Sequence, residues 1–378
     1  MTHAVPAGRR CTVVGAGVFG LSAAWALSRR GWEVEVLEAG PAVGHDWSGS
    51  KGGARVFRLG YPEAHHVDMA RRAADLWQGL AAASGRHLLH RTGQASLGDE
   101  AALRAVAGAL ASAGVPAEWL SPDEVRQRFP QIAARAAVLF EPSSGVLAAD
   151  ECLRALCETA DFELRTRTRA SLVHERGGAV TVTTEDGRRF DADVAVVCAG
   201  PWTLGLVGGG HAVAAPPSAP QVAYFGPAPG HEEPALPVFI EWGEDMVYGL
   251  PVPGGAPHGG TFKVSQHVPG VPLTPDQLEH GAPPPDDRAL LGALSDAVRR
   301  LLPGLHPEPL ATERCVYDNS ANGDFVLDRV GRVVIGCGSS GHGFKFGPLV
   351  GELLADLAEG VPPAVDLFRF RVRRGTDG

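Results

Sequence analysis

The sequence predicts a two-domain α/β protein in which an antiparallel domain is inserted into a domain built on a mainly parallel sheet. A glycine-rich turn joins an apolar strand to a helix within residues 11–30, which is typical of a parallel β-α-β unit. Strands and helices mix without that rhythm over residues 94–143, and a Pro-rich stretch over residues 214–285 holds short alternating strands. The 378 residues are enough for two domains that share one core.

The N-terminal unit predicts a dinucleotide site. Its elements are strand 11–14, turn 15–20, helix 21–30 and strand 33–38. In the turn, Gly15 and Gly17 let the backbone approach a pyrophosphate at the helix N-terminus, and Gly20 lets helix and strand pack closely. Glu38 ends the second strand, where its carboxylate can bind ribose hydroxyls. The alternative is a glycine-rich turn that binds no ligand. The presence of both strands, the helix and Glu38 argues against that alternative.

A strand predicted at residues 194–198 favours FAD over a nicotinamide cofactor. It ends in Ala199-Gly200 and follows a mixed region, whereas a nicotinamide enzyme would more often continue with regular β-α-β units. In FAD-binding folds a late strand returns beside the first nucleotide-binding unit. We therefore expect FAD as the cofactor.

The remaining elements extend both parts of the fold. Helices are expected over residues 66–83, 151–159 and 348–357 and strands over 162–167, 179–184, 247–251, 261–267 and 333–336, with the strands from 162 to 198 continuing the parallel sheet. The Pro283–Asp286 segment is expected to cap a helix whose apolar face includes Leu290 and Leu294. We expect a nucleotide-binding domain of residues 1–90, 145–212 and 320–378, and a substrate domain of residues 91–144 and 213–319.

Composition excludes several classes of partner and site. The net charge is −9 and no basic stripe is present, so a nucleic-acid partner is not expected. No apolar run approaches the roughly 18 residues of a membrane span, and the first one is too short for a signal peptide. These features predict a cytoplasmic protein with no membrane partner. The six cysteines include no C-x-x-C pair, so neither a metal site nor a disulfide framework is expected.

Lysine is rare in this chain. Of the 34 basic residues only three are lysines, namely Lys51, Lys263 and Lys345. Arginine provides almost all other positive charges of the chain. A lysine therefore indicates a position that needs a compact ammonium group and that a guanidinium group would not fit. All three lysines lie in segments that we assign to the cofactor site.

Four segments carry a resemblance to a known family, and they cover residues 48–63, 140–147, 314–317 and 341–346. Together they resemble the sarcosine oxidase family of flavin amine oxidases, within the D-amino-acid-oxidase superfamily, with monomeric sarcosine and N-methyltryptophan oxidases as the most similar members. The resemblance implies a Rossmann-like FAD-binding domain with an inserted antiparallel-sheet substrate domain, of the glutathione-reductase-2 type. It further implies cofactor contacts from Gly15, Gly17, Val18, Phe19, Gly20, Glu38, Ser48, Lys51, Arg55, Ala199, Gly200, Trp202, Gly341, Gly343, Phe344 and Lys345.

Cys315 matches the family cysteine that is joined by a thioether to the 8α-methyl carbon of the flavin. Independently of the resemblance, Cys315 lies in a mixed polar segment, and the neighbouring Arg314 can help a thiol to reach its thiolate form. An inert, half-buried cysteine is the alternative.

The resemblance also implies the roles of several polar side chains. Lys263 matches the lysine that activates oxygen, since a fixed ammonium stabilises negative charge as it develops on O₂; a surface lysine on a strand is the alternative. Arg58 and Lys345 match the pair that binds the substrate carboxylate. The other matched positions are Arg55 near the flavin ring, Tyr248 and His267 in the substrate cavity and Tyr317 beside the flavin, for which ordinary packing is the alternative.

Departures from the family pattern bear on the substrate. Lys51-Gly52-Gly53 stands where the family usually has His-Gly-Asp, and the Pro/Gly-rich loop between Tyr248 and Lys263 is longer than in sarcosine oxidase. We therefore expect a monomeric oxidase of a small secondary or cyclic amino acid larger than sarcosine, which forms an imine and reduces O₂ to H₂O₂. A flavin dehydrogenase with another electron acceptor, an NAD-dependent dehydrogenase and a non-catalytic flavoprotein are the alternatives.

Overall fold

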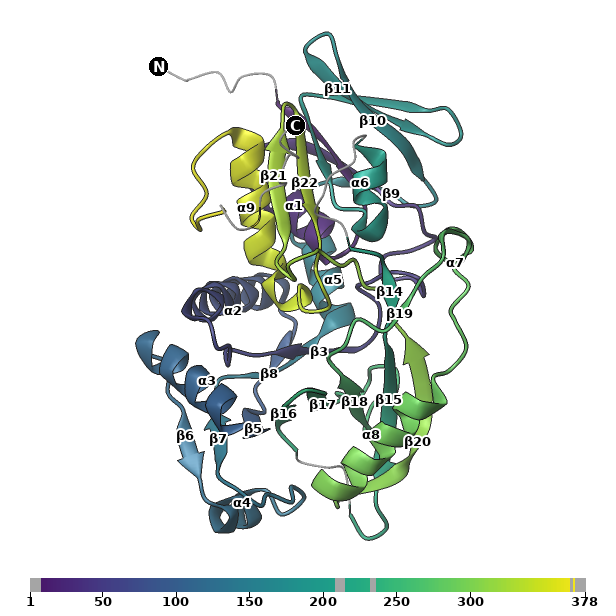
Figure 1. Cartoon of the computed structure of the whole chain (residues 1–378). Coiled ribbons are helices and arrows are strands. Elements are labelled where there is room, and N and C mark those ends of the chain that lie inside the picture. The colour runs from purple at the N-terminus through teal and green to yellow at the C-terminus, as the bar shows by residue number, and fades with distance from the viewer. Residues whose placement is uncertain (1–7, 208–214, 232–235, 368–369, 371–378) are drawn as a thin grey trace, which may run out of the picture.

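The protein, described by a computed structural model over residues 8–207, 215–231, 236–367 and Phe370, has two parts stacked along the vertical axis of Figure 1. The upper part is built on a six-stranded sheet. In order across the sheet, its strands are β21 (Val326–Val330), β22 (Val333–Cys337), β13 (Val194–Val197), β1 (Arg10–Val14), β2 (Glu33–Leu37) and β9 (Glu163–Arg165). All neighbouring pairs are parallel except the edge pair of β21 and β22. The late strand β13 therefore lies directly beside β1, as the sequence predicts.

Helices cover one face of this sheet. They are α1 (Val18–Arg29), α5 (Ala149–Glu158) and α9 (Gly347–Glu359), whose buried residues join the strands in one core cluster. Glycine lets α9 approach α1 closely, because a Cβ at Gly351 would lie 2.3 Å from the backbone oxygen of Ser22. The apolar faces of these helices thus hold the glycine turn between β1 and α1 against the sheet.

One strand differs from the prediction. β11 (Ala179–Thr184) belongs to a separate antiparallel sheet with β10 (Ala170–Arg176) and β12 (Arg189–Ala192), so its expected place in the parallel sheet is wrong. Gly177 and Gly178 join β10 to β11, both with positive φ, which is the backbone of a tight hairpin turn. The Gly-Gly pair was the sequence signal for this antiparallel pairing.

The lower part is built on an eight-stranded sheet. In order across the sheet, its strands are β20 (Leu305–Arg314), β15 (Gln221–Pro227), β18 (Phe262–Gln266), β17 (Val247–Pro251), β16 (Val238–Trp242), β5 (Gln94–Gly98), β7 (Val138–Glu141) and β6 (Glu118–Leu120). Its neighbouring strands run antiparallel except β16 and β5. This sheet confirms the predicted fold class, which combines α/β and antiparallel sheets. The domain boundaries remain a proposal, and the one at residue 212 lies outside the described residues.

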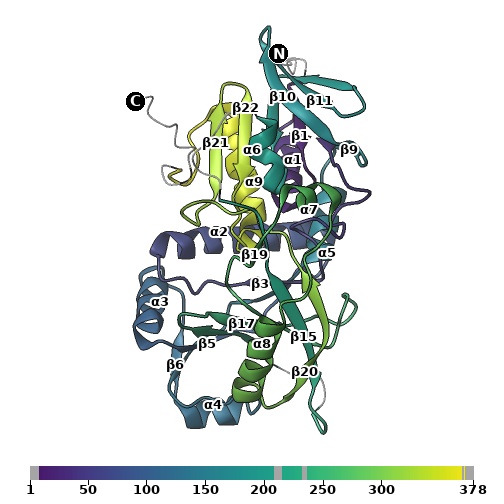
Figure 2. The ribbon, with the colours of Figure 1, turned by 45° about the vertical axis from the view of Figure 1, so that its right-hand side comes forward.

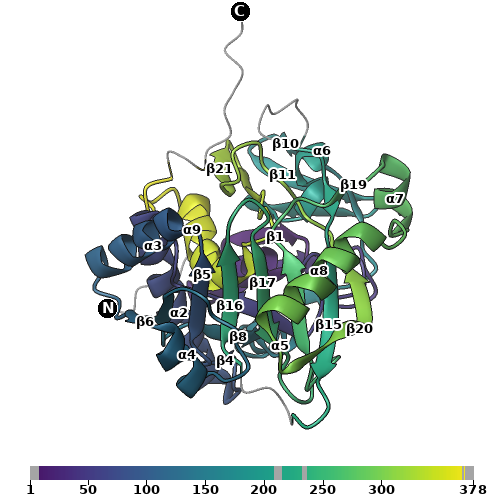
Figure 3. The same cartoon turned by 60° about the horizontal axis from the view of Figure 1, so that its bottom comes forward.

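Helix α8 (Arg288–Leu301) packs on this sheet, as Figure 3 shows from below. Leu294, Val298 and neighbouring apolar residues bury its inner face. Its N-cap is Asp287, whose side chain accepts hydrogen bonds from two backbone N–H groups of the first turn. The prediction that the Pro283–Asp286 segment caps this helix is wrong by one residue, because Asp286 instead accepts a hydrogen bond from Gln221.

Two elements lie between the upper and lower parts in Figure 2: the long helix α2 (Ala64–Ser84) and a small antiparallel sheet. The sheet consists of β3 (Ala54–Phe57), β8 (Gly145–Ala148) and β4 (Leu89–His90). β3 carries Arg55 and leads to Arg58, so it brings both predicted site residues to the junction.

The remaining α-helices and β-strands of the described residues are α3 (Glu100–Ser112), α4 (Pro122–Arg128), α6 (Thr203–Leu206), α7 (Pro275–His280), β14 (Ser218–Ala219) and β19 (Val271–Pro272). Among the described residues, no helix combines the length and the apolar character that crossing a bilayer requires.

Candidate active site

Two adjoining cavities lie at the junction of the upper and lower parts. The larger has a volume of about 780 Å³ and begins at the glycine turn and Glu38. The smaller has a volume of about 110 Å³ and lies against β3, β17 and β18. Four residues line both cavities: Gly49, Val316, Ser339 and Phe344. The shared wall makes one site with a wide and a narrow compartment.

The glycine turn has the geometry that the motif predicts. Gly15 has a φ of 98°, and a Cβ there would lie 2.5 Å from the backbone oxygen of Cys198. A Cβ at Gly20 would lie 1.9 Å from the backbone oxygen of Gly15. No other residue fits either position without moving the backbone, so the turn can stay close to β13 and leave room for a ligand.

A serine outside the motif completes the N-terminus of α1. Gly17 is the N-cap residue and has no side chain, but Ser50 Oγ accepts a hydrogen bond from the backbone N–H of Val18 at 2.9 Å. Sequence analysis missed this residue, because Ser50 is 32 positions away and only the tertiary fold brings it to the helix.

Glu38 is a buried, ionised carboxylate on the wall of the larger cavity. It accepts hydrogen bonds from the backbone N–H groups of Ala16 and Gly40, both at 2.7 Å. Burial raises its pKa, but His45 and these two N–H groups outweigh burial and hold the pKa below its usual value. Each carboxylate oxygen has two lone pairs, so the group can still accept hydrogen bonds from ribose hydroxyls.

The other predicted cofactor residues divide between the cavities. The larger is lined by Val18, Phe19, Ser48, Ala199, Gly200 and Trp202, and the smaller by Arg55, Gly341, Gly343, Phe344 and Lys345. Lys51 instead lines a neighbouring cavity of about 330 Å³ with Glu313 and Arg314.

The larger cavity fits an FAD molecule. Trp202 Nε1 is buried without a hydrogen-bond partner among the described residues, which is a donor that a ligand in this cavity can satisfy. The cavity runs from the helix N-terminus, which favours phosphate, to the aromatic ring of Phe344 at the smaller compartment. Gly15, Glu38 and Trp202 would hold the nucleotide half of the cofactor.

Positive side chains surround the smaller cavity. Arg58 stacks on Tyr61, with its guanidinium carbon 4.2 Å from the ring centroid, and Lys345 Nζ lies 5.8 Å from the same centroid. Lys345 is 5% exposed and donates a hydrogen bond to the backbone oxygen of His342 at 2.8 Å. Burial raises the pKa of Tyr61, but Lys345 and Arg58 outweigh burial and lower it. Because the two cations stabilise negative charge on a group between them, this end of the cavity suits a carboxylate.

Lys263 provides a separate buried cation. It lies on β18, is 4% exposed, and pairs in register with Tyr224 of β15. Burial and the charge of Arg55 lower the pKa of Lys263 to about 8. The side chain of Lys263 therefore remains largely protonated at neutral pH. Because it is buried, water screens its positive charge only weakly.

His267 stays neutral in the same cavity. Burial, and then the charges of Arg58 and Lys345, lower its pKa to about 4. Burial raises the pKa of both Tyr248 and Tyr317, so these phenols are neutral as well. The side chains predicted for the substrate site therefore line one cavity. Its cations are arginine and lysine side chains, and His267 is neutral.

Cys315 lines the smaller cavity, whereas Arg314 lines the neighbouring one and donates a hydrogen bond to the backbone oxygen of Ala219 at 2.9 Å. The guanidinium of Arg314 also donates a hydrogen bond to the backbone oxygen of Pro285, so backbone oxygens outside the smaller cavity hold it. Arg314 therefore does not supply the cation that the sequence interpretation assigned to it. Lys263 lines the same cavity as Cys315.

Glu313 is a further site residue that sequence analysis missed. It accepts a hydrogen bond from Tyr224 Oη at 2.7 Å, and its charge interacts with that of Lys263. His258 stacks on Tyr224 with ring centroids 4.1 Å apart. No local sequence pattern marks Glu313, because the residues that it contacts lie on the distant strands β15 and β18.

Comparisons with known proteins identify the family of this chain. The DAO family, described as FAD dependent oxidoreductase, matches residues 10–357. The chain is 32% identical to human peroxisomal sarcosine oxidase, over 96% of this chain and 95% of the relative. It is 29% identical to N-methyl-L-tryptophan oxidase of Citrobacter koseri, over 96% and 98%. The structure of NikD, "an unusual amino acid oxidase essential for nikkomycin biosynthesis", has a TM-score of 0.81, 25% identity and 97% and 98% coverage.

These matches confirm the predicted resemblance to sarcosine oxidases and the predicted use of FAD. The match to the family extends over most of the chain and includes both the glycine turn and the segment of Lys345. This protein is an enzyme of the DAO family of FAD dependent oxidoreductases.

Proposed function

We propose that this enzyme is an FAD-dependent oxidase of a secondary or cyclic amino acid, which converts the amine to an imine and reduces O₂ to H₂O₂. The observation that carries the proposal is a pair of cations, the partly buried Arg58 and the buried Lys345, that share Tyr61 at one end of the smaller cavity. A site with two such cations binds an anionic group of the substrate. In this proposal the site residues have the roles that the family resemblance implies.

The substrate class follows from the relatives and from the cavity. Relatives named sarcosine oxidase and N-methyl-L-tryptophan oxidase have N-methyl amino acids in their names, and these are secondary amines with a carboxylate. Apolar contacts from Ile240 and Met246 face the same cavity as Arg58. This combination favours an amino acid whose carboxylate meets the cations and whose side chain or ring meets the apolar wall.

The protein residues bind and orient the substrate. Arg58 offers two parallel N–H donors and Lys345 a point charge, so the carboxylate is held in one orientation. The neutral His267 adds no charge that would repel a cationic amine, and the surrounding cations favour the unprotonated amine that the reaction needs. When bound, FAD would supply the redox chemistry, as acceptor of a hydride equivalent from the substrate and donor of electrons to O₂. Lys263 stabilises the negative charge that develops on oxygen.

The pH dependence of the reaction with O₂ should follow Lys263. Its pKa is lowered to about 8, so the ammonium is present below that pH and is lost as the pH rises through it. We expect the rate of flavin reoxidation to be constant below the pKa and to fall by about tenfold per pH unit above it. Stopped-flow reoxidation of substrate-reduced enzyme at a series of pH values measures this profile. A rate that rises above the pKa would contradict the role of the ammonium.

We also propose that the flavin is attached covalently through the sulfur of Cys315. The thiol is 9% exposed and lines the compartment that adjoins Phe344 and Val316. Replacing Cys315 with Ser should abolish the link, so that acid precipitation releases yellow flavin into the supernatant instead of retaining it in the pellet. The matched control is Cys337→Ser, at a buried cysteine of β22, which should leave the colour in the pellet. Flavin retained in the pellet of Cys315→Ser would contradict the assignment.

One experiment tests the proposed function as a whole. Purified holoenzyme is assayed for peroxide release and O₂ consumption with N-methyl amino acids, cyclic amino acids and the same amines without a carboxylate. We expect peroxide from one or more of the acids and little from the amines. An enzyme that bleaches with these acids under anaerobic conditions but makes no peroxide in air would instead be a dehydrogenase with another acceptor. Failure of every acid to bleach the flavin would contradict the substrate class.

A further inference from the structure

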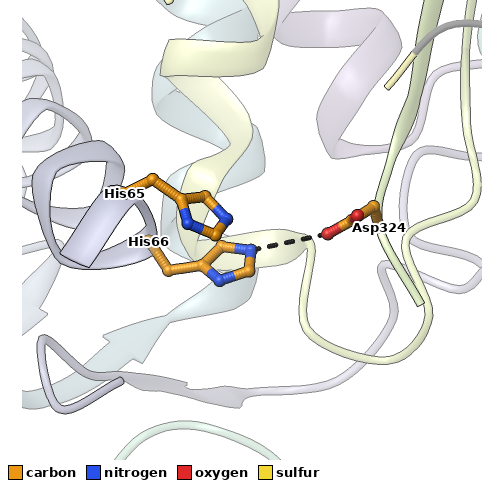
Figure 4. A group of neighbouring side chains, drawn as sticks. All are labelled: His65, His66 and Asp324. Carbon is orange, nitrogen blue, oxygen red and sulfur yellow. Dashed lines mark ion pairs between the residues drawn. The ribbon is translucent and has the colours of Figure 1, made fainter. Parts of the chain in front are cut away.

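A group of potential metal ligands lies outside the two cavities. His65 and His66 are at the start of α2, and Asp324 precedes β21. One ligand atom from each residue lies within 4.8 Å of the other two. Figure 4 shows a nitrogen of each imidazole directed toward the carboxylate of Asp324. The three side chains come from segments about 260 positions apart in the sequence and converge on one point.

His66 is the central residue of this group. It is 9% exposed, and neither of its ring nitrogens has a hydrogen-bond partner among the described residues. The nearest charged atoms are Glu63 Oε2, 3.5 Å from Nδ1, and Asp324 Oδ1, 3.9 Å from Nε2. A buried imidazole without hydrogen bonds is costly, so this geometry calls for a partner that the protein chain does not provide.

The carboxylates of Glu63 and Asp324 indicate which tautomer of the His66 imidazole is present and how the ring is oriented. A metal-binding histidine usually donates its other N–H to a carboxylate, which fixes the tautomer. Glu63 is placed to receive Nδ1–H, and this leaves the lone pair of Nε2 facing the Asp324 oxygen. Asp324 Oδ2 in turn accepts a hydrogen bond from Asn322 at 3.1 Å, so Oδ1 is the oxygen turned to His66. In this tautomer a metal ion between Nε2 and Oδ1 can bind both atoms.

We propose that His65, His66 through Nε2 and Asp324 through Oδ1 form a binding site for a divalent transition-metal ion of the zinc type. Two imidazoles and one carboxylate are ligands that Zn²⁺ and Co²⁺ prefer, whereas Mg²⁺ and Ca²⁺ prefer oxygen ligands alone. Ligand atoms of a tetrahedral zinc site lie about 3.3 Å apart. The Nε2–Oδ1 distance of 3.9 Å therefore needs to shorten by only about half an ångström.

The charges around the group are consistent with a dication at this position. Asp324 and Glu63 together supply two negative charges to balance the ion.

The site lies behind the cations of the smaller cavity. The ring of His66 is 5.2 Å from that of Tyr61 and 6.1 Å from that of His342, centroid to centroid. Tyr61 contacts Arg58, and the backbone of His342 accepts the hydrogen bond from Lys345. A bound ion would join the start of α2 to the segment of Asp324 and so hold this wall of the cavity in place.

Cobalt titration tests the site. Tag-free holoenzyme is treated with a chelator, and Co²⁺ is added while its d–d absorption is followed at wavelengths beyond the flavin bands. We expect saturation at about one equivalent of Co²⁺, displacement by Zn²⁺, and a melting temperature that rises with Zn²⁺ concentration. Absence of saturable Co²⁺ binding would overturn the proposal.

Variants assign the ligands. His66→Gln and Asp324→Asn should each weaken Co²⁺ binding by at least about tenfold. Glu63 is exposed, so Glu63→Gln should fold normally and weaken binding by about tenfold through loss of the orienting carboxylate. The control is His87→Ala in the His87–His90 pair, whose rings lie 4.2 Å apart without a grouped carboxylate among the described residues. Equal binding by His66→Gln and the native protein, or loss of binding in His87→Ala alone, would overturn the assignment.

Discussion

Replacing Lys263 with Met should slow the reoxidation of the flavin by O₂ by about 100-fold or more, and change its anaerobic reduction by substrate by no more than about threefold. A preorganised charge at the position where negative charge develops contributes about 10²–10³ in rate. Lys263 is such a charge, because it is 4% exposed and held on the central strand β18. Met has a similar length and no charge, so the change removes the ammonium and keeps most of the packing. Stopped-flow spectroscopy measures the two half-reactions separately.

Lys51→Met is the matched control for this variant. Lys51 contributes to the electrostatic environment of Lys263, but it lines the neighbouring cavity and not the smaller one. We expect its replacement to change reoxidation by less than about threefold. Equal losses in both variants would mean that the overall positive charge matters and not the ammonium of Lys263. An unchanged rate in Lys263→Met would remove Lys263 from the reaction with oxygen.

The parallel core of the fold was predictable because its signals are local. The glycine spacing and the β1–α1–β2 pattern lie within about 30 residues, and the apolar run of β13 marks the strand that pairs with β1. β11 was assigned to the wrong sheet, because the prediction followed the apolar run Ala179–Thr184 and did not use the Gly177-Gly178 turn that precedes it. The small sheet of β3, β8 and β4 was not predicted, since strands of two to four residues carry almost no periodicity.

The candidate site was predictable only where a short motif or the family resemblance marked it. Arg58 and Lys345 are far apart in the sequence, and nothing in local chemistry pairs them before Tyr61 is seen between them. Ser50 was missed because a cap from a distant segment has no sequence pattern. Arg314 was misinterpreted because adjacency in the sequence does not place two side chains in one cavity, and Arg314 and Cys315 line different ones.

The His65–His66–Asp324 group shows the same limit. The sequence predicts no metal site, because that prediction rested on the absence of a C-x-x-C pair among the six cysteines. In the structure two of the proposed ligands come from α2 and the third from a segment near the opposite end of the chain. Adjacent histidines at the start of a helix are common surface features, so only the buried position of His66 and the approach of Asp324 give them significance.

Replacing Arg58 or Lys345 with Met should lower kcat/KM for the amino acid by about 10–150-fold in each case, and by more in the double variant. A hydrogen bond to a charged group contributes about 1.5–3 kcal/mol, and 1.4 kcal/mol corresponds to a factor of ten. Both cations contact the same ring of Tyr61 and would bind the same carboxylate, so the two losses should not be additive. Steady-state peroxide assays of the native enzyme and the three variants measure the coupling.

The substrate without its carboxylate supplies the control, because it removes the other partner of the same interaction. For this amine, kcat/KM should be low with native enzyme and should change by less than about threefold in Arg58→Met and Lys345→Met. Arg58→Lys should lie between native and Arg58→Met for the amino acid, since it keeps the charge and loses the planar fork. If the variants reduced the rates of acid and amine equally, the cations would act on the general structure of the cavity, and the carboxylate would have to bind elsewhere.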